Sequence, residues 1–464
     1  MNRRAFLKSL VVTAAATSLP LATTIRRKPN IIMILVDDLG WTDLGCFGSD
    51  FYETPNIDQI ARRGVRFSNA YAACTVCSPT RASLLTGKYP ARLHVTDWIH
   101  GEQRENEKFI NPEWTHYLPL KEKTIAEALK ELGYKTIHIG KWHLGEKEHY
   151  PEKQGFNSNI GGYHKGQPPS YFYPYRGNDW NPEIPTLKGG KEGEFLTDRE
   201  ATEACRFIEE NWDRPFFLNL WHYAVHTPLM APKNLMTKYE QKIDIGMKHN
   251  HPAYAGLVES VDNAFGRLWK KLKELNLEKD TIILFTGDNG GLTLGYITDN
   301  SPLREGKGSC YEGGVRVPMF IWYDGIQPFV CEEPVISCDF FPTIINMVQD
   351  NPVLPIPMDG KNLVPLLKNP GLQLDREAIF WHYPHYHTGG ATPYSAIRCR
   401  DWKLIKFYET GNLELYHLKN DIGERNDLSE KEPEKTQVFH NQLNQWLKEV
   451  NAQMPVPNPK FEER

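Results

Sequence analysis

The stretch Asn30-Ile31-Ile32-Met33-Ile34-Leu35-Val36-Asp37-Asp38-Leu39-Gly40 is an almost unbroken apolar run that ends in two carboxylates and a glycine. A run without polar alternation is typical of a strand buried on both faces, which occurs in mostly parallel sheets. Open α/β sheets bind their ligands at the carboxyl ends of such strands. The sequence therefore predicts an α/β core with Asp37 and Asp38 at its functional edge, although an ordinary Asp-rich turn would look the same.

Further apolar runs alternate with amphipathic segments over residues 28–350, which indicates a doubly wound, mostly parallel sheet flanked by helices. Predicted strands are 65–71, 135–139, 215–221, 281–286 and a segment that ends at Trp322. From about residue 375 the chain changes to short aromatic strands and a final helix, the pattern of a small antiparallel sheet with one helix. We therefore predict a catalytic α/β domain over 28–360 and a smaller C-terminal α+β subdomain over 370–464.

The composition and the N-terminal residues indicate an exported globular protein. The 464 residues have 40% hydrophobic and 12% aromatic side chains and a formal net charge of -4. These values describe a globular chain and give no electrostatic argument for a nucleic-acid or membrane partner. Residues 1–24 begin with Arg3-Arg4-Ala5-Phe6-Leu7-Lys8 and continue as a short uncharged run, the pattern of an export signal. We expect a periplasmic, cell-surface or secreted protein without stable membrane insertion after signal removal.

The string Cys77-Ser78-Pro79-Thr80-Arg81, followed by Leu85-Thr86-Gly87, is the most specific motif in the chain. Pro79 and the helix-forming residues after it place Cys77 at a helix N-terminus. Backbone N–H groups favour anions there, and a thiol at that position would be activated. For an arbitrary string of this type, a buried apolar cysteine and a surface arginine are the simpler interpretation.

The extended string, from Cys77 to Gly87, resembles the signature of the type I sulfatases of the alkaline phosphatase superfamily, in which the cysteine is converted to formylglycine. Other matching strings are Gly140-Lys141-Trp142-His143, Gly287-Asp288-Asn289 and Glu414-Leu415-Tyr416. The resemblance therefore spans the mature chain. It implies an alkaline-phosphatase-like fold, a formylglycine-generating maturation enzyme as a partner, and a hydrated aldehyde that attacks a sulfate ester.

The resemblance also implies a metal site at the predicted strand ends. Its ligands would be Asp37, Asp38, Asp288, Asn289 and the converted Cys77. Carboxylate and amide oxygens suit a hard cation, and family members mostly use Ca²⁺, with Mg²⁺ as the second choice.

The remaining catalytic roles implied by the resemblance fall on basic residues. Arg81, Lys141 and Lys307 would hold the nucleophile and the sulfate oxygens. His226, alone or with Lys307, would protonate the departing alcohol, and His143 would take a proton from the second hydroxyl of the hydrated aldehyde. Any one of these residues taken singly is more often a solvated or structural group. Their joint match to one pattern is what carries the assignment.

The substrate is predicted less sharply. Export and the aromatic loop at 150–197 suggest a carbohydrate sulfate, and the string 92–98 is similar to bacterial sulfatases acting on galactose or N-acetylgalactosamine sulfates. The run 382–387 and Arg398 would line the leaving-group side. Candidate substrate contacts are Asp97, Trp98, His100, Arg304 and His385. Two alternatives remain open: a phosphodiester or phosphonate monoester hydrolase of the same superfamily, and a non-catalytic glycan-binding protein with an unconverted cysteine.

Overall fold

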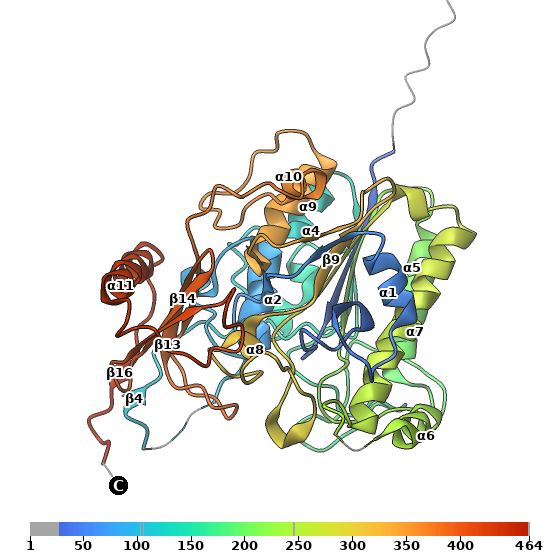
Figure 1. The fold of residues 1–464 in the computed structure, drawn as a ribbon. Helices are drawn as coiled ribbons and strands as arrows, with labels where there is room; N and C mark the ends of the chain where they lie inside the picture. Colours follow the sequence, from blue (N-terminus) through green and yellow to red (C-terminus); the bar gives the residue numbers. More distant parts are fainter. Residues whose placement is uncertain (1–26, 103, 105, 245, 463–464) are drawn as a thin grey trace, which may run out of the picture.

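The computed structural model describes residues 27–102, 104, 106–244 and 246–462. The predicted export signal, residues 1–24, lies outside the described residues. Among the described helices, none combines the length and the apolarity needed to cross a membrane. The chain builds one large sheet covered by helices and a second, smaller sheet beside it (Figure 1).

The large sheet has eight strands in the order β10-β2-β9-β8-β1-β7-β5-β6. Its strands in chain order are β1 (Asn30–Val36), β2 (Val65–Phe67), β5 (Lys135–Gly140), β6 (Ser158–Ile160), β7 (Phe216–His222), β8 (Thr281–Gly287), β9 (Met319–Trp322) and β10 (Phe329–Cys331). β1 is parallel to both of its neighbours, β7 and β8. Among the described strands of this sheet, only β9 runs antiparallel to its neighbours, β2 and β8. The predicted α/β class with a mostly parallel sheet is confirmed.

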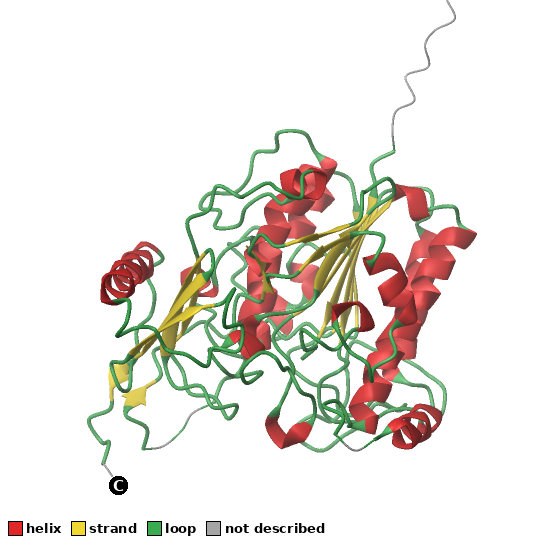
Figure 2. Cartoon of the chain, viewed as in Figure 1, coloured by secondary structure: helices red, strands yellow, loops and turns green. Residues whose placement is uncertain are grey.

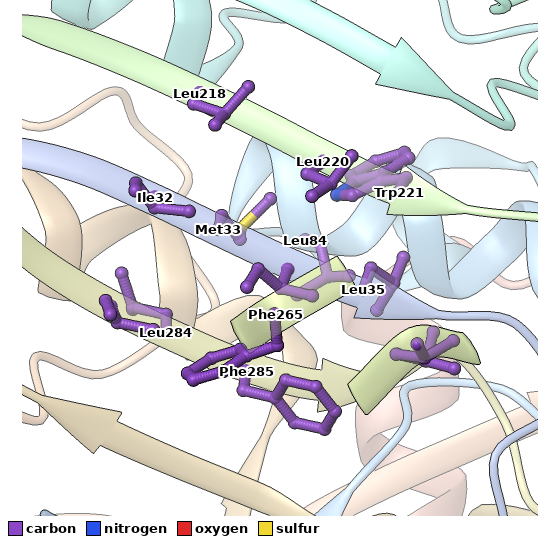
Figure 3. Packing of buried hydrophobic residues seen from close by; sticks show 14 of the residues in the cluster. Ile32, Met33, Leu35, Leu84, Leu218, Leu220, Trp221, Phe265, Leu284 and Phe285 are labelled. Atoms are coloured by element: carbon purple, nitrogen blue, oxygen red, sulfur yellow. The ribbon is translucent and has the colours of Figure 1, made fainter. Parts of the chain in front are cut away.

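The central strands are buried because helices cover both faces of the sheet. All seven residues of β1, β7 and β8 are buried. One face carries α1 (Pro55–Ala61), α5 (Leu196–Glu210), α6 (Lys233–Lys242) and α7 (Pro252–Glu274); the other carries α2 (Cys77–Thr86), α4 (Ile125–Glu131), α9 (Phe340–Val348) and α10 (Val364–Lys368) (Figures 1 and 2). Side chains of these strands form one cluster with Leu84 of α2 and Phe265 of α7 (Figure 3).

The smaller sheet is an antiparallel meander that carries one helix. Its strands are β12 (Ile379–Tyr383), β13 (Tyr394–Cys399), β14 (Trp402–Phe407) and β15 (Leu413–His417), and they are adjacent in that order. α11 (Pro433–Glu449) packs on it: the Trp446 ring stacks on Phe380 with centroids 4.6 Å apart. The predicted antiparallel sheet with a final helix is confirmed.

The prediction of a single strand over 65–71 is wrong. The chain forms β2 in the large sheet, turns at Ser68 and Asn69, and then forms β3 (Ala70–Tyr71), which pairs with β11 (Val335–Ile336) in a separate two-stranded sheet. The polar pair causes the change of sheet, because Asn69 donates from its side chain to Glu332 O at 2.6 Å and accepts from Val335 N at 3.0 Å. The short elements α3 (Pro90–Leu93), β4 (Phe109–Ile110), α8 (Glu312–Val315) and β16 (Val456–Pro457) complete the fold.

Candidate active site

Three carboxylates and one amide meet at the carboxyl end of the large sheet. Asp37 and Asp38 follow β1, while Asp288 and Asn289 follow β8. The two strands are parallel neighbours and end level with each other, so their last side chains converge. Asp38 N donates to Asp288 Oδ1 at 3.1 Å, and Asn289 Nδ2 donates to Asp38 Oδ1 at 2.8 Å. All four residues are buried.

Helix α2 brings Cys77 and Arg81 to this cluster. Cys77 is the first residue of the helix, and all ten residues of the helix are buried. Ligand atoms of Cys77, Asp37 and Asp288 lie within 4.8 Å of one another. One turn later, Arg81 donates to Asp288 Oδ2 from Nε at 2.9 Å and from Nη2 at 2.7 Å. The arginine is therefore a buried cation that holds a carboxylate beside the cysteine.

The thiol of Cys77 is not activated, contrary to the prediction from its helix position. Burial raises its pKa above the ordinary value, and this outweighs the lowering effect of the nearby Lys141 and Lys307. A low-dielectric environment disfavours a thiolate even at a helix N-terminus. An unmodified Cys77 is therefore a protonated, inert thiol in this fold.

Two lysines form ion pairs with the two aspartates that follow β1. Lys141 Nζ lies 2.6 Å from Asp37 Oδ2, and Lys307 Nζ lies 2.7 Å from Asp38 Oδ1. Burial and then Asp288 raise the pKa of Asp37 well above its usual value. Burial would also raise the pKa of Asp38, but Lys307 and His226 outweigh it and hold that pKa below the usual range. The site thus brings several carboxylates close together, and the nearby protein cations stabilise the ionised form of Asp38 more than that of Asp37.

Two histidines flank the carboxylates. His226 follows β7, and its Nε2 lies 3.6 Å from Asp38 Oδ2. Burial and then Lys307 lower its pKa to about 3. The His143 ring contacts Ile99 O through Nε2, while its Nδ1 is buried without a hydrogen-bond partner in the described residues. Burial and then Lys141 lower the pKa of His143 well below its usual value. Both imidazoles are held neutral.

The donor set fits a hard cation. Asp37 Oδ1 and Asn289 Oδ1 are buried oxygens without a hydrogen-bond partner in the described part of the chain. Buried oxygens of this kind are costly unless something bonds to them. Because they belong to a carboxylate and an amide beside two more carboxylates, Ca²⁺ or Mg²⁺ would satisfy them best.

The five candidate substrate contacts lie in different surroundings. Asp97 is buried and accepts from Tyr383 Oη at 2.8 Å, and His385 is buried with its Nε2 2.8 Å from Thr96 Oγ1. The Arg304 guanidinium packs over the Tyr311 ring at 3.6 Å and donates to Glu424 O at 3.1 Å. The Arg304 side chain is thus occupied by protein partners, whereas Asp97 Oδ2 and His385 Nδ1 are buried without a hydrogen-bond partner in the described residues.

Trp98 and His100 lie on the same segment as Asp97. Trp98 is half-buried and packs against the hydrophobic cluster of the smaller sheet. The His100 side chain is 52% exposed and lies 3.4 Å from Glu146. Of the five, His100 is the side chain that leaves most of its surface open to a ligand.

His387 is a residue that the sequence placed only within a histidine-rich run. A Cβ on Gly308 would lie 1.9 Å from His387 Nδ1, so the glycine lets this imidazole approach the segment that carries Lys307. Gly389 N donates to His387 Nδ1 at 2.9 Å. Burial and then Lys307 lower its pKa to about 4. No sequence signal distinguishes it from His385, because only the turn after β12 decides which of the two reaches Lys307.

Residues 29–349 match the family model described as Sulfatase, and residues 306–453 match the one described as N-sulphoglucosamine sulphohydrolase, C-terminal. The chain belongs to the sulfatase family. It is a sulfuric ester hydrolase, so the alternative of a non-catalytic glycan-binding protein is set aside.

Relatives of this sulfatase cover nearly the whole chain. A protein described as "Sulfatase" from Formosa agariphila is 32% identical over 92% of this chain and 90% of its own length. N-acetylgalactosamine-6-sulfatase of Homo sapiens is 30% identical over 86% of this chain and 81% of its own length. The crystal structure of Ps i-CgsB in complex with k-i-k-neocarrahexaose superposes with a TM-score of 0.77, at 30% identity, over 92% of this chain and 94% of that one.

Proposed function

We propose that this sulfatase removes sulfate from a sulfated carbohydrate, with Cys77 converted to formylglycine and a Ca²⁺ ion held by the strand-end oxygens. The observation that carries the proposal is the convergence of Arg81, Lys141 and Lys307 on buried carboxylates around Cys77. Cations fixed in a dry site stabilise an anionic group far better than cations in water. A sulfate ester is a substrate that such a site fits.

A bound cation and the formylglycine would supply part of the chemistry. Asp37, Asp38, Asp288 and Asn289 would hold the cation, which acts as a Lewis acid that polarises oxygen. The formylglycine at position 77 would supply a hydrated aldehyde as nucleophile. Arg81 keeps both together, because it bonds to Asp288 from the same helix that starts at Cys77.

The chain's own residues would bind and orient the ester. Lys141 and Lys307 lie beside the two aspartates and would hold the sulfate oxygens, adding stabilisation as charge develops. His226 together with Lys307 would protonate the departing alcohol at the side of Asp38, because the Lys307 ammonium carries the proton that the neutral imidazole lacks. His143 would accept a proton through Nδ1, the buried nitrogen that has no hydrogen-bond partner in the described residues.

The carbohydrate is proposed to be a galactose or N-acetylgalactosamine sulfate. Support comes from the string 92–98, from the human relative named N-acetylgalactosamine-6-sulfatase and from the neocarrahexaose complex of Ps i-CgsB. His100 would contact the sugar directly, because its side chain is exposed beside the Ile99 carbonyl that touches His143. Asp97, Trp98, Arg304 and His385 stay candidates that would shape the mouth through their partners.

The proposal also covers the export and the maturation of the chain. Residues 1–24 would direct export to the periplasm, cell surface or medium, and a formylglycine-generating enzyme would act as the maturation partner. Cys77 and the Pro79 and Arg81 of its motif are buried. The maturation enzyme would therefore meet the motif before the chain folds.

Hydrolysis assays test the proposed reaction. Protein from the native host would be given galactose and N-acetylgalactosamine sulfates, p-nitrophenyl sulfate and the diester bis(p-nitrophenyl) phosphate, with Cys77→Ala as the matched inactive control. We expect turnover of sulfate esters, highest for a sugar sulfate, and none by the variant. Faster turnover of the phosphate diester would favour the phosphodiesterase alternative and overturn the proposal.

A further inference from the structure

We propose that Asp43 and Tyr254 are positioning residues for the cation site: together they hold Asp38 in the backbone conformation that aims its carboxylate at the other ligands. The inference rests on the proposed metal site. Neither residue belongs to the ligand set, and both are fully buried. Tyr254 contacts the main chain of the ligand Asp38, and Asp43 contacts Tyr254 and the turn that follows Asp38.

Asp38 adopts an unusual backbone conformation. Its φ of 60° lies in the left-handed region, which is uncommon for residues other than glycine and is entered most often by residues such as Asp and Asn. In this conformation its N–H points to Asp288 Oδ1 at 3.1 Å, while its carboxylate faces Lys307 and Asn289. A strained residue persists only where its surroundings determine its conformation, so something must hold the Asp38 carbonyl as well.

Tyr254 supplies that bond from the opposite side of the turn. It lies in the first turn of α7, and its hydroxyl is 3.1 Å from Asp38 O. The same hydroxyl contacts Asp43 Oδ2, which it reaches from across the turn. A hydroxyl can donate only one hydrogen bond at a time. The single hydroxyl proton is therefore shared between two acceptors, the Asp38 carbonyl and the Asp43 carboxylate, so the three groups form one cluster.

Asp43 closes the turn that starts at Asp38. Its Oδ2 accepts from Gly40 N at 2.8 Å, and its Oδ1 accepts from Thr298 Oγ1 at 2.9 Å, with His249 Nε2 3.6 Å away. A buried carboxylate is expensive to desolvate, and a simple surface turn would not require one. Its bonds fix the segment after β1 to α7 and to the loop that carries Thr298, so Asp38 cannot relax toward ordinary φ values.

The test is a Ca²⁺ titration of metal-stripped protein by isothermal calorimetry. Tyr254→Phe removes only the hydroxyl, and Tyr52→Phe is the matched control because its hydroxyl bonds to Thr298 Oγ1 at 3.1 Å in the same cluster without touching Asp38. Loss of groups that orient a metal ligand typically weakens binding by about 10- to 100-fold. We expect a Kd at least about tenfold higher for Tyr254→Phe and a Kd within about twofold of wild type for Tyr52→Phe.

The Asp43→Asn variant is a second test of the proposal, which can be made even if the Tyr254→Phe variant does not fold. It should weaken Ca²⁺ binding, and the double variant should lose no more than the worse single variant, because both residues act through one turn. A wild-type-like Kd for Tyr254→Phe or Asp43→Asn would overturn this proposal alone. Wild-type protein that binds neither Ca²⁺ nor Mg²⁺ would overturn the metal site with it, whatever the hydrolysis assays show.

Discussion

The Lys307 ammonium pairs with Asp38 inside the site. In the proposed reaction it both binds the sulfate oxygens and stabilises the charge that develops on them. Lys307→Ala should lower kcat/KM on the best sulfate ester by about 100-fold or more, the usual loss when one fixed donor to a developing charge is removed. Steady-state kinetics measure it, with Lys419→Ala on the exposed surface as the control. A loss below about tenfold would show that Lys307 does not hold the sulfate.

The free energy of unfolding should depend on pH through the buried Asp97 carboxyl. Burial raises the pKa of Asp97 to about 7. Because the folded pKa lies above the unfolded value of about 3.9, the stabilising contribution is complete below about pH 4 and is lost as pH rises to about 7. Relative to Asp97→Asn, the wild type should lose up to about 4 kcal/mol of unfolding free energy across that window.

Denaturant unfolding of wild type and Asp97→Asn at several pH values measures this difference. The exposed Asp179→Asn is the control, and its difference from wild type should stay flat. If the Asp97→Asn difference is also flat between pH 4 and pH 7, Asp97 is ionised in the folded protein and the prediction is wrong.

The sequence predicts the position of site residues that lie in one motif or at the end of a recognisable strand. It does not predict contacts between residues that meet only in the folded chain. Asp37, Asp288 and Lys141 each follow a recognisable buried strand, so their convergence follows from parallel topology. The protonated state of Cys77 depends on how deeply α2 is buried, which no local string encodes. Tyr254 meets Asp38 across 216 residues of sequence, a separation that no local pattern bridges.

Helix α2 ends at a glycine whose conformation the site depends on, because this helix carries Cys77 and Arg81. Gly87 has φ 70°, and a Cβ there would lie 2.4 Å from Met358 Sδ and 3.0 Å from Phe341 Cβ. Gly133, after α4, has φ 86° with no atom within 4 Å of such a Cβ. Gly133→Ala should cost about 1 kcal/mol from backbone strain alone, and Gly87→Ala roughly 2–3 kcal/mol.

Thermal unfolding of the two variants compares these costs. Because both glycines are left-handed, the strain contribution cancels and the difference between the variants reports the contact with Met358 and Phe341. Equal losses would mean that these side chains move aside freely, contrary to the expectation.

Secondary structure followed from sequence where one pattern continued for several residues. The buried runs of β1, β7 and β8 were predicted because a strand buried on both faces leaves a continuous apolar run. The division of 65–71 into β2 and β3 was not predictable. It depends on bonds from Asn69 to residues 332 and 335, which lie far away in the sequence.

The whole molecule depends on a buried ionic cluster between the two sheets. Lys403 of β14 lies 3.1 Å from Glu312 of α8 and 2.9 Å from Glu424, and all three side chains are fully buried. Glu312 also pairs with Arg316 at 2.8 Å. The smaller sheet is thereby fixed to the segment that follows Lys307, so its docking and the geometry of the site are linked.

Lys403→Met should therefore destabilise the protein strongly. The substitution keeps the volume of the side chain but removes the cation that pairs with the buried Glu424, while Glu312 keeps Arg316; loss of one partner of a buried pair typically costs about 3–5 kcal/mol. Denaturant unfolding measures the loss, with the exposed Lys419→Met as the control. A loss below about 1 kcal/mol would show that the cluster does not hold the two sheets together.

The mass of the tryptic peptide 67–81, from alkylated protein made in its native host, reports directly whether Cys77 is converted to formylglycine. This peptide contains both Cys74 and Cys77, so Cys74 is an internal control for alkylation. We expect one alkylated cysteine and, at position 77, a residue lighter by the exchange of a thiol for an aldehyde. Two alkylated cysteines in a preparation that hydrolyses sulfate esters would contradict this expectation.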